Sequence, residues 1–462
     1  IMKIKRVMIA APKSGSGKTI VTCALLQVLR GLGFKAASFK CGPDYIDPMF
    51  HEKILNVPAK NLDTYFTDKE TTNMLFTDSA GKSDIAVIEG VMGLYDGLGG
   101  IREEGSSYHL AKVTKTPIVM VVDAKGTGRS IIPLIAGFLS YDKEKLIKGV
   151  ILNNISKGYY ETIKPLIEEE LGITVLGFLP KNERFHMESR HLGLFLPDEV
   201  ISLRERIEEA SQLFLQTVSV ERLIQIAGDA DDLKSGSLVT KTAGSERKPV
   251  IAVAKDRAFC FYYADNIRLL EEYGAEIKYF SPLFDEKIPE PCHGLLLGGG
   301  YPELNAEQLS RNITMRDSVR NAVKNKLPVV AECGGFMYLH TALKDGNGIW
   351  HEMAGAIPAT CFYTGKLVRF GYIALQEKHN YFLPDGEIIK GHEFHYYEST
   401  ENGADVRAVK PVTGKEYACV IENEMQWMGF PHLYYPSNPF FAKLFVEKAM
   451  RYEKMAGSSK ML

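Results

Sequence analysis

One cysteine of this sequence stands where a nucleophile would be placed. The stretch LPVVAECGGFMYLH sets Cys333 between an apolar run and a segment with helical character, and Gly334 and Gly335 follow it directly. A buried structural cysteine needs no glycines after it, whereas a nucleophile on a tight strand-to-helix turn does. A helix that begins at this point would also lower the pKa of the thiol. The pattern therefore predicts that Cys333 is a catalytic nucleophile.

Such a nucleophile needs backbone donors for an oxyanion, and it needs a base. The N–H of Gly334 is one candidate donor, and Gly299 or Gly300 of the loop LLLGGGYPE supplies a second. His432 lies in a Pro- and Tyr-rich loop before the last predicted helix and is a candidate base. Spacing alone does not choose it among the seven histidines of this half, which are His293, His340, His351, His379, His392, His395 and His432.

A second group of residues is suited to phosphate chemistry. AAPKSGSGKT, residues 10–19, follows a short apolar run and opens a helical pattern, as a phosphate-binding loop does. Pro12 stands where the strict motif has its first glycine, and the loop resembles the deviant Walker A type, in which an extra lysine contacts nucleotide, sometimes across a dimer. The predicted ATP-binding residues of this loop are Lys13, Gly15, Ser16, Gly17, Lys18 and Thr19, with the hydroxyl of Thr19 on Mg²⁺.

Carboxylates follow the neighbouring predicted strands. Glu89 ends the apolar run of IAVIEG, and Asp44 and Asp47 lie in the loop of KCGPDYIDPMFH. Acids at the carboxyl ends of parallel strands face the ligand crevice of an open sheet, so these three are candidates for Mg²⁺ or for a substrate carboxylate. Turn formation and helix capping are the alternative roles of the two aspartates. Asn153, at the end of a later strand, is a candidate for contact with the adenine of ATP.

Alternating strands and helices must position these residues. Mostly apolar runs predict strands that are buried on both faces of a parallel sheet, at 5–11, 34–40, 83–90, 116–124, 148–154 and 173–180. We therefore expect a doubly wound α/β ATP-binding domain over residues 2–227 and a linker over the polar segment 228–248.

A second α/β domain is expected over residues 249–455. Its strands are predicted at 249–256, 276–283, 294–300 and 327–335, and its helices at 264–273, 305–325 and 438–454. Shorter β segments are expected between 350 and 430.

Composition restricts the classes of function. The chain has 462 residues and a formal net charge of −2, which does not suggest a nucleic-acid binder or a polybasic membrane patch. The seven cysteines form no CxxC pair, which favours reduced thiols in a cytoplasmic protein. No apolar run reaches the roughly 18 residues that span a bilayer.

These motifs together resemble the cobyrinate a,c-diamide synthase family. AECGG, GGGYPE and HLYYPSNP are similar to the nucleophile turn, oxyanion loop and catalytic-histidine region of class I glutamine amidotransferases of the cobyrinate and cobyric acid synthase type. The first half is similar to ATP-binding domains of the dethiobiotin synthetase and MinD group. The motifs that point to the diamide family are KCGPDYIDPMFH, IEGVMGLYDG, SRHLGL (189–194) and GHEFHY.

The resemblance implies a Cys333–His432 dyad that releases ammonia from glutamine. Many class I glutaminases carry an acid two residues after the histidine, but Tyr434 stands there in this chain. ATP and Mg²⁺ are implied for the phosphorylation of the a and c acetate carboxylates of cobyrinate, which ammonia then converts to amides.

The sequence is also compatible with other functions. The same chemistry on nickel-sirohydrochlorin or hydrogenobyrinate is the nearest alternative, and a MinD-like ATPase switch is a remote one. A homodimer is expected from the deviant loop.

Overall fold

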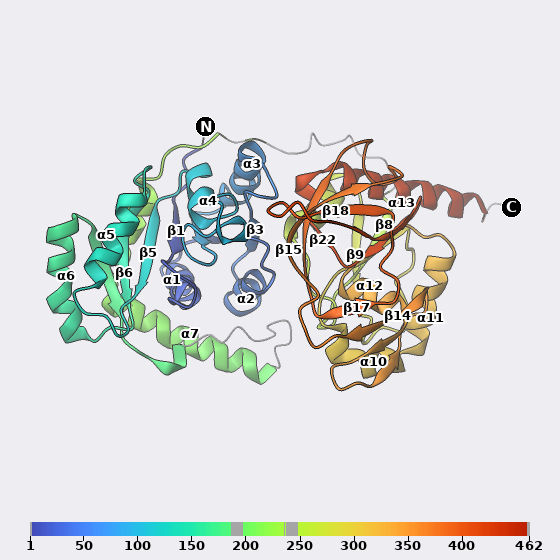
Figure 1. Ribbon diagram of the computed structural model, residues 1–462, viewed down its shortest axis with the longest axis horizontal. Coiled ribbons are helices and arrows are strands. Elements are labelled where there is room, and N and C mark those ends of the chain that lie inside the picture. The colour runs from blue at the N-terminus through green and yellow to red at the C-terminus, as the bar shows by residue number, and fades with distance from the viewer. Residues whose placement is uncertain (1, 186–196, 235, 237–247, 460–462) are drawn as a thin grey trace. The chain divides into compact units, whose positions relative to one another are not determined.

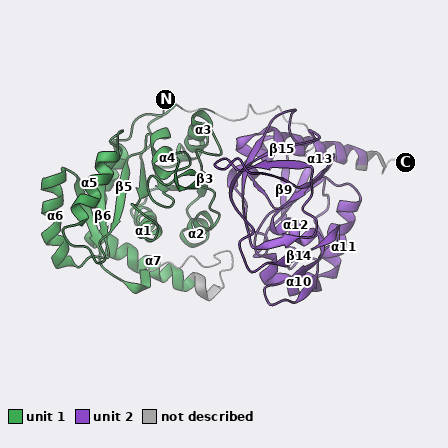
Figure 2. Ribbon diagram, in the orientation of Figure 1, with its two compact units in different colours: residues 1–238 green, residues 239–462 purple. Residues whose placement is uncertain are grey.

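The computed structural model describes residues 2–185, 197–234, 236 and 248–459. The chain forms two compact units, Ile1–Leu238 and Val239–Leu462, each with its own internal contacts (Figure 2). The α/β fold predicted for both halves is confirmed, with seven strands in the main sheet of unit 1 and six in that of unit 2. No helix in the described part of the chain is long and apolar enough to cross a membrane.

Unit 1 is built on a parallel sheet with the order β3-β2-β4-β1-β5-β6-β7. The strands are β1 (Arg6–Ala10), β2 (Ala36–Cys41), β3 (Ala59–Leu62), β4 (Ile85–Glu89), β5 (Ile118–Asp123), β6 (Ile147–Asn153) and β7 (Thr174–Leu179). Every residue of β1 and β4 is buried, as the continuous apolar runs predicted.

The helices of unit 1 cover this sheet, and α7 packs along α1 (Figure 1). The helices are α1 (Lys18–Gly31), α2 (Ile46–Leu55), α3 (Lys69–Ala80), α4 (Ser107–Val113), α5 (Ile131–Tyr141), α6 (Lys157–Leu171), α7 (Pro197–Thr217) and α8 (Val220–Gly228). Because β1, β2 and β4 are neighbours, the loops after them meet at one edge of the sheet, as expected for a ligand crevice.

The predicted linker, 228–248, falls largely outside the described residues. Its first residues pack on unit 1, because Met2 and Leu233 exchange two backbone hydrogen bonds and Arg6 donates to the carbonyl of Asp231. The domain boundaries at 227 and 249 stay a prediction. The SRHLGL motif also lies outside the described residues.

Unit 2 contains three sheets. The main sheet has the order β20-β21-β11-β10-β8-β9 and is parallel except for β20. Its strands are β8 (Val250–Ala254), β9 (Glu276–Phe280), β10 (Gly294–Leu297), β11 (Val329–Glu332), β20 (Ile421–Asn423) and β21 (Gln426–Gly429). Its helices are α9 (Ala264–Glu272), α10 (Ala306–Arg311), α11 (Ile313–Lys324), α12 (Gly334–Leu339) and α13 (Phe440–Ser459).

The β segments expected between 350 and 430 form two smaller sheets. One contains β12 (His340–Lys344), β13 (Trp350–Glu352), β14 (Ile357–Tyr363) and β17 (Tyr397–Ser399). The other contains β15 (Arg369–Glu377), β16 (Ile389–His395), β18 (Val406–Val409), β19 (Glu416–Cys419) and β22 (His432–Leu433).

The prediction of a single helix over residues 305–325 is wrong. The structure has α10 and α11 with Asn312 between them, and the side chain of Asn312 accepts a hydrogen bond from the N–H of Met315. An asparagine that caps a new helix ends the old one, because it bonds to the backbone in place of the helical partner.

The turn between β11 and α12 leaves no room for a side chain at Gly335. A Cβ there would lie 2.1 Å from the carbonyl oxygen of Leu297, which belongs to the backbone of the neighbouring strand. This second glycine of the AECGG motif is therefore required by close packing of α12 on β10.

We predict that Gly335→Ala destabilises unit 2 by about 1–3 kcal/mol, because a buried backbone must shift to admit the methyl group. Both tryptophans, Trp350 and Trp427, belong to unit 2, so fluorescence-detected urea unfolding reports on this unit. Gly346→Ala is the matched control, because a Cβ there meets nothing within 4 Å. Equal midpoints for the two variants would contradict the prediction.

Candidate functional site

The phosphate loop of unit 1 connects β1 to α1. Gly15 and Gly17 have φ values of 76° and 99°, a left-handed conformation that favours glycine. The side-chain amide of Asn153 donates to the carbonyl of Ser16 over 2.9 Å, and a Cβ on Gly17 would lie 2.3 Å from that nitrogen. In this structure Asn153 therefore holds the phosphate loop through a hydrogen bond to its backbone. The contact with adenine that the sequence suggested stays a prediction.

The two lysines of the loop differ in burial. Lys18 is buried, and its Nζ donates to the carbonyl of Met92 over 2.6 Å. Burial, and then the positive charge of Lys40, lower the pKa of Lys18 to about 8. Lys13 is exposed on the same loop, and its carbonyl accepts from the hydroxyl of Ser16.

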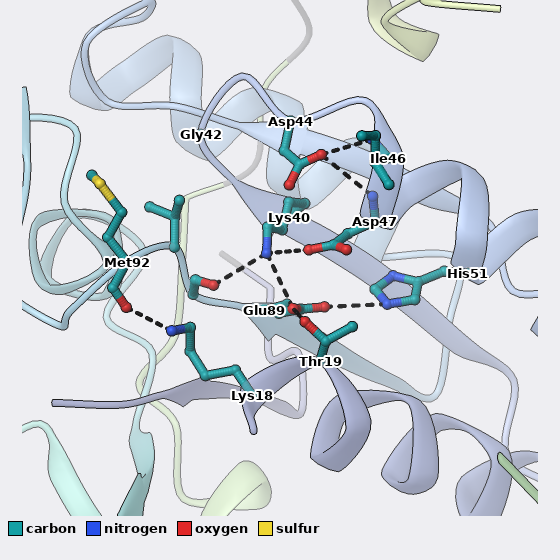
Figure 3. Close-up of polar contacts among 12 residues, drawn as sticks. Lys18, Thr19, Lys40, Gly42, Asp44, Ile46, Asp47, His51, Glu89 and Met92 are labelled. Carbon is teal, nitrogen blue, oxygen red and sulfur yellow. Dashed lines mark hydrogen bonds and ion pairs between the residues drawn. The ribbon is translucent and has the colours of Figure 1, made fainter. Parts of the chain in front are cut away.

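Glu89 is the centre of a polar network at the edge of the sheet (Figure 3). Its Oε1 accepts from the hydroxyl of Thr19 at 2.7 Å and from Nζ of Lys40 at 3.1 Å. Its Oε2 lies 3.3 Å from Nε2 of His51. Lys40 also forms an ion pair with Asp47. The structure therefore brings Thr19, Glu89 and Asp47 together.

Asp44 and Asp47 have different surroundings. Oδ1 of Asp44 accepts from the N–H of Ile46 at 2.7 Å and of Asp47 at 3.4 Å, so Asp44 organises the start of α2. This is the turn-forming role named as the alternative. Asp47 instead points to Lys40.

Lys40 and His51 are residues of this network that sequence reasoning missed. Lys40 is a buried cation near the end of β2, and a lysine inside an otherwise apolar strand was a usable signal. His51 is fully buried on α2, and its Nδ1 lies 2.8 Å from the hydroxyl of Ser38.

Burial and charge act in opposite directions on the pKa of each acid. Burial acts to raise the pKa of Glu89, but Lys40, the nearby imidazole of His51 and the hydrogen bond from Thr19 outweigh it and hold that pKa well below its usual value. Burial, and then the negative charge of Glu89, raise the pKa of Asp47 to about 7 against the effect of Lys40. Glu89 is thus a carboxylate at neutral pH.

Unit 2 carries the second site, at the turn after β11. Cys333 has φ 46° and ψ −104°, a strained conformation for a residue with a side chain. Its N–H donates to the carbonyl of Gly429, and its carbonyl accepts from the N–H of Met337, both over 2.9 Å. These bonds from a neighbouring strand and from α12 hold the turn in place.

The glycine loop after β10 lies against this turn. A Cβ on Gly334 would be 3.1 Å from the backbone nitrogen of Gly300, so the two predicted oxyanion donors are neighbours. The carbonyl of Gly299 accepts from the N–H groups of Cys260 and Phe261 at 3.0 Å, which fixes the loop.

His432 completes this group of residues. A Cβ on Gly299 would lie 2.4 Å from Cε1 of His432, so the imidazole packs directly on the glycine loop. His432 pairs with His392 across β22 and β16, and the two rings stack with centroids 5.0 Å apart. The structure therefore links Cys333, Gly334, Gly300, Gly299 and His432 in one cluster.

The pKa of the cysteine differs from the sequence-based expectation. Burial, and then the negative charge of Glu303, raise the pKa of Cys333 well above its usual value, although the N–H of Gly334 opposes them. Burial, and then the charges of His392 and His395, lower the pKa of His432. A short helix does not overcome burial here, and burial favours the neutral form of both the thiol and the imidazole.

Comparisons with known proteins agree with this division of the chain. A family described as the CobQ/CobB/MinD/ParA nucleotide binding domain matches residues 7–194. A family described as the CobB/CobQ-like glutamine amidotransferase domain matches residues 250–433. The fold and these matches define an ATP-dependent amidotransferase ligase.

Relatives over the full length give the particular family. The chain is 38% identical to the cobyrinate a,c-diamide synthase of Thermoplasma volcanium over 98% of this chain and 99% of that protein. It is 40% identical to the enzyme of the same name from Clostridium tetani over 85% of this chain and 87% of that protein. This chain belongs to the cobyrinate a,c-diamide synthase family, which confirms the resemblance.

The Glu89 network predicts a pH-dependent cost of removing Lys40. Lys40→Met leaves Glu89 buried without its cation, which should cost about 3–5 kcal/mol at pH 7. Lys40 lowers the folded pKa of Glu89, so its stabilisation exists above the unfolded pKa of the carboxyl and is lost as the pH falls through the folded pKa. In Lys40→Met the main cause that lowers the pKa of Glu89 is gone and burial raises that pKa, so the buried acid of the variant binds a proton between pH 7 and pH 5 and the cost should shrink at pH 5.

Hydrogen exchange of the β4 amides at pH 5 and pH 7 measures this cost. Lys125→Met, which removes an exposed lysine of the same unit, is the control. A cost that is equal at both pH values would show that Lys40 acts through packing alone.

Proposed function

We propose that this chain uses glutamine and ATP to convert the a and c acetate carboxylates of cobyrinate to carboxamides. The observation that carries the proposal is that one chain combines the Cys333 cluster with the Glu89 network and matches, over nearly its full length, relatives named for this reaction. Glutamine supplies the nitrogen, and ATP activates the carboxylate.

In the proposed glutaminase reaction, Cys333 attacks the side-chain amide of glutamine. His432 takes the thiol proton, which ends on the departing ammonia. The N–H groups of Gly334 and Gly300 stabilise the oxyanion, and Gly299 holds His432 beside them. Water then releases glutamate from the thioester. Because burial favours the neutral form of both the thiol and the imidazole, the charged pair forms only as glutamine is attacked.

In the proposed ligase reaction, the loop from Gly15 to Thr19 binds the phosphates of ATP. Lys18 neutralises charge on the β- and γ-phosphates, and exposed Lys13 is available to the nucleotide of this or a second copy of the chain. Transfer of the γ-phosphoryl group to the substrate carboxylate gives an acyl phosphate. Ammonia displaces the phosphate and leaves a carboxamide.

A magnesium ion fits the oxygen groups of this site. The hydroxyl of Thr19 and the carboxylate of Glu89 are 2.7 Å apart, and hydroxyl and carboxylate oxygens are the ligands that Mg²⁺ prefers beside phosphates. When bound, the ion supplies positive charge for the transferred phosphoryl group. Lys40 and Asp47 would then be free to rearrange around the substrate carboxylate, and Asp44 would fix the loop that carries Asp47.

The cytoplasm is the proposed location, because ATP and glutamine are available there and the seven cysteines of the structure are free thiols. A homodimer is proposed from the exposed position of Lys13 on the phosphate loop.

The direct test is incubation of the purified protein with glutamine, Mg-ATP and one tetrapyrrole at a time, with products scored by mass. Cobyrinate should gain two amides. If nickel-sirohydrochlorin or hydrogenobyrinate gained amides instead, that tetrapyrrole would be the substrate, and the proposed chemistry would stand. ATP hydrolysis without amidation of any tetrapyrrole would favour the MinD-like switch and contradict the proposal.

Cys333→Ala should abolish glutamine-dependent amidation and leave the reaction with free ammonia close to wild type. The reason is that the thiol acts only in the release of ammonia. Cys361→Ala, which changes another buried cysteine of unit 2, is the control. Glutamine hydrolysis by Cys333→Ala would exclude this residue as the nucleophile.

Lys18→Ala should stop amidation from both nitrogen sources, because activation of the carboxylate requires ATP. Glutamine hydrolysis measured without tetrapyrrole should persist, which verifies unit 2, and wild-type hydrogen exchange of the β1 amides verifies the fold of unit 1. Amidation with free ammonia at the wild-type rate would refute the role of Lys18.

A further inference from the structure

Glu332, the residue directly before the nucleophile, is a buried acid beside the candidate base. Its side chain is 6% exposed, and its Oε2 lies 4.0 Å from Nδ1 of His432. Its Oε1 is buried and has no hydrogen-bond partner among the described residues. A buried polar atom without a partner costs about 1–3 kcal/mol, so packing alone does not account for an acid at this position.

The position at which an acid was expected does not supply one. Tyr434, two residues after His432, is buried, and its ring packs edge-on against Tyr263 with centroids 5.1 Å apart. A phenol provides no carboxylate for the imidazole. Glu332 lies at the end of β11, in a different element from His432 on β22, and its carboxyl group is near the imidazole.

We propose that Glu332 is the positioning residue for His432. It takes the role of the acid that many class I glutaminases carry two residues after their histidine. In the reacting form its carboxylate accepts a hydrogen bond from Nδ1–H of His432. This proposal rests on the proposed roles of Cys333 and His432. It places the acid that orients the base one residue before the nucleophile in sequence.

The proposed hydrogen bond fixes which nitrogen of His432 can accept the thiol proton. Hydrogen on Nδ1 leaves Nε2 as the acceptor of the Cys333 thiol proton, because the bond made by one ring nitrogen sets the tautomer of the other. The sulfur electron pair attacks the amide carbon, and the proton later leaves on ammonia. Glu332 binds no proton during the step, and its negative charge stabilises the imidazolium. Nothing is oxidised or reduced.

The distance of 4.0 Å has to shorten for this hydrogen bond to form. Catalytic hydrogen bonds are often long in ligand-free proteins and shorten in the substrate complex. Burial raises the pKa of Glu332 to about 8, against the smaller effect of the backbone of Leu433, the neighbour of His432. The carboxylate form therefore increases as the pH rises through this range.

Other charged and titratable groups also face His432. His392 stacks on it from β16, and the charges of Glu393 and His395 on the same strand act on it. Cys333 lies on the turn after β11. Glu332 is the group whose carboxyl oxygen is directed at Nδ1, which makes it the one to vary.

Two variants separate charge from hydrogen bonding. Glu332→Gln keeps an acceptor oxygen but has no ionisable group, whereas Glu332→Met has neither. We expect the kcat of glutamine hydrolysis to fall about tenfold in the Gln variant and about a hundredfold in the Met variant, with KM for glutamine little changed. Amidation with free ammonia should stay near wild type in both, which verifies unit 1, and urea unfolding followed by the fluorescence of Trp350 and Trp427 verifies the fold of unit 2.

The pH profile gives a readout that a structural role would not change. The wild-type kcat should rise through the ionisation of Glu332, and Glu332→Gln should lack this rise. Glu422→Gln is the matched control, because Glu422 is a buried acid on β20, in another sheet than His432, with a pKa raised to about 10. Its profile should equal that of wild type.

The outcomes separate this proposal from the proposed function. Wild-type kcat and an unchanged pH profile in both Glu332 variants would overturn the positioning role alone. An increase in KM without loss of kcat would also overturn it and would make Glu332 part of glutamine binding. Failure of the wild-type protein to hydrolyse glutamine would instead reject the role of Cys333. If the Met variant does not fold, the Gln variant and its pH profile still decide the question.

Discussion

The dominant physical constraint in both sites is the cost of keeping charge away from water. In unit 1, Glu89 is fully buried and stays ionised only because Lys40, His51 and Thr19 surround it. Those partners come from α1, β2 and α2, so the charge of one side chain requires three elements to meet where the strands end. The network therefore couples the local fold to the chemistry of the loop.

Unit 2 meets the same constraint by avoiding charge. Cys333, His432 and Glu332 are buried close together, and burial favours the neutral form of each. Backbone groups hold the site instead of ion pairs, through the bonds of Cys333 to Gly429 and Met337 and of Gly299 to Cys260. Burial thus favours neutral groups in the Cys333 cluster, whereas the Glu89 network contains charged groups.

Local sequence predicted those parts of the fold and site that depend on neighbouring residues. The strand-to-helix turns at Lys18 and Cys333 and the glycines around them were readable, because each is a short continuous motif. Lys40, His51 and Glu332 were missed, because their importance arises from contacts between segments far apart in sequence. The prediction for the thiol failed for the same reason, since burial by distant elements decides its pKa. Asn312 ended a helix that apolar periodicity alone extended.

The buried, protonated state of Cys333 has a consequence for the chemical durability of the protein. Peroxide and electrophilic metabolites react with thiolates far faster than with thiols. A cysteine that is 7% exposed and whose neutral form is favoured by burial is thus a poor target for oxidation. The burial that favours the neutral thiol therefore also protects this sulfur from oxidants.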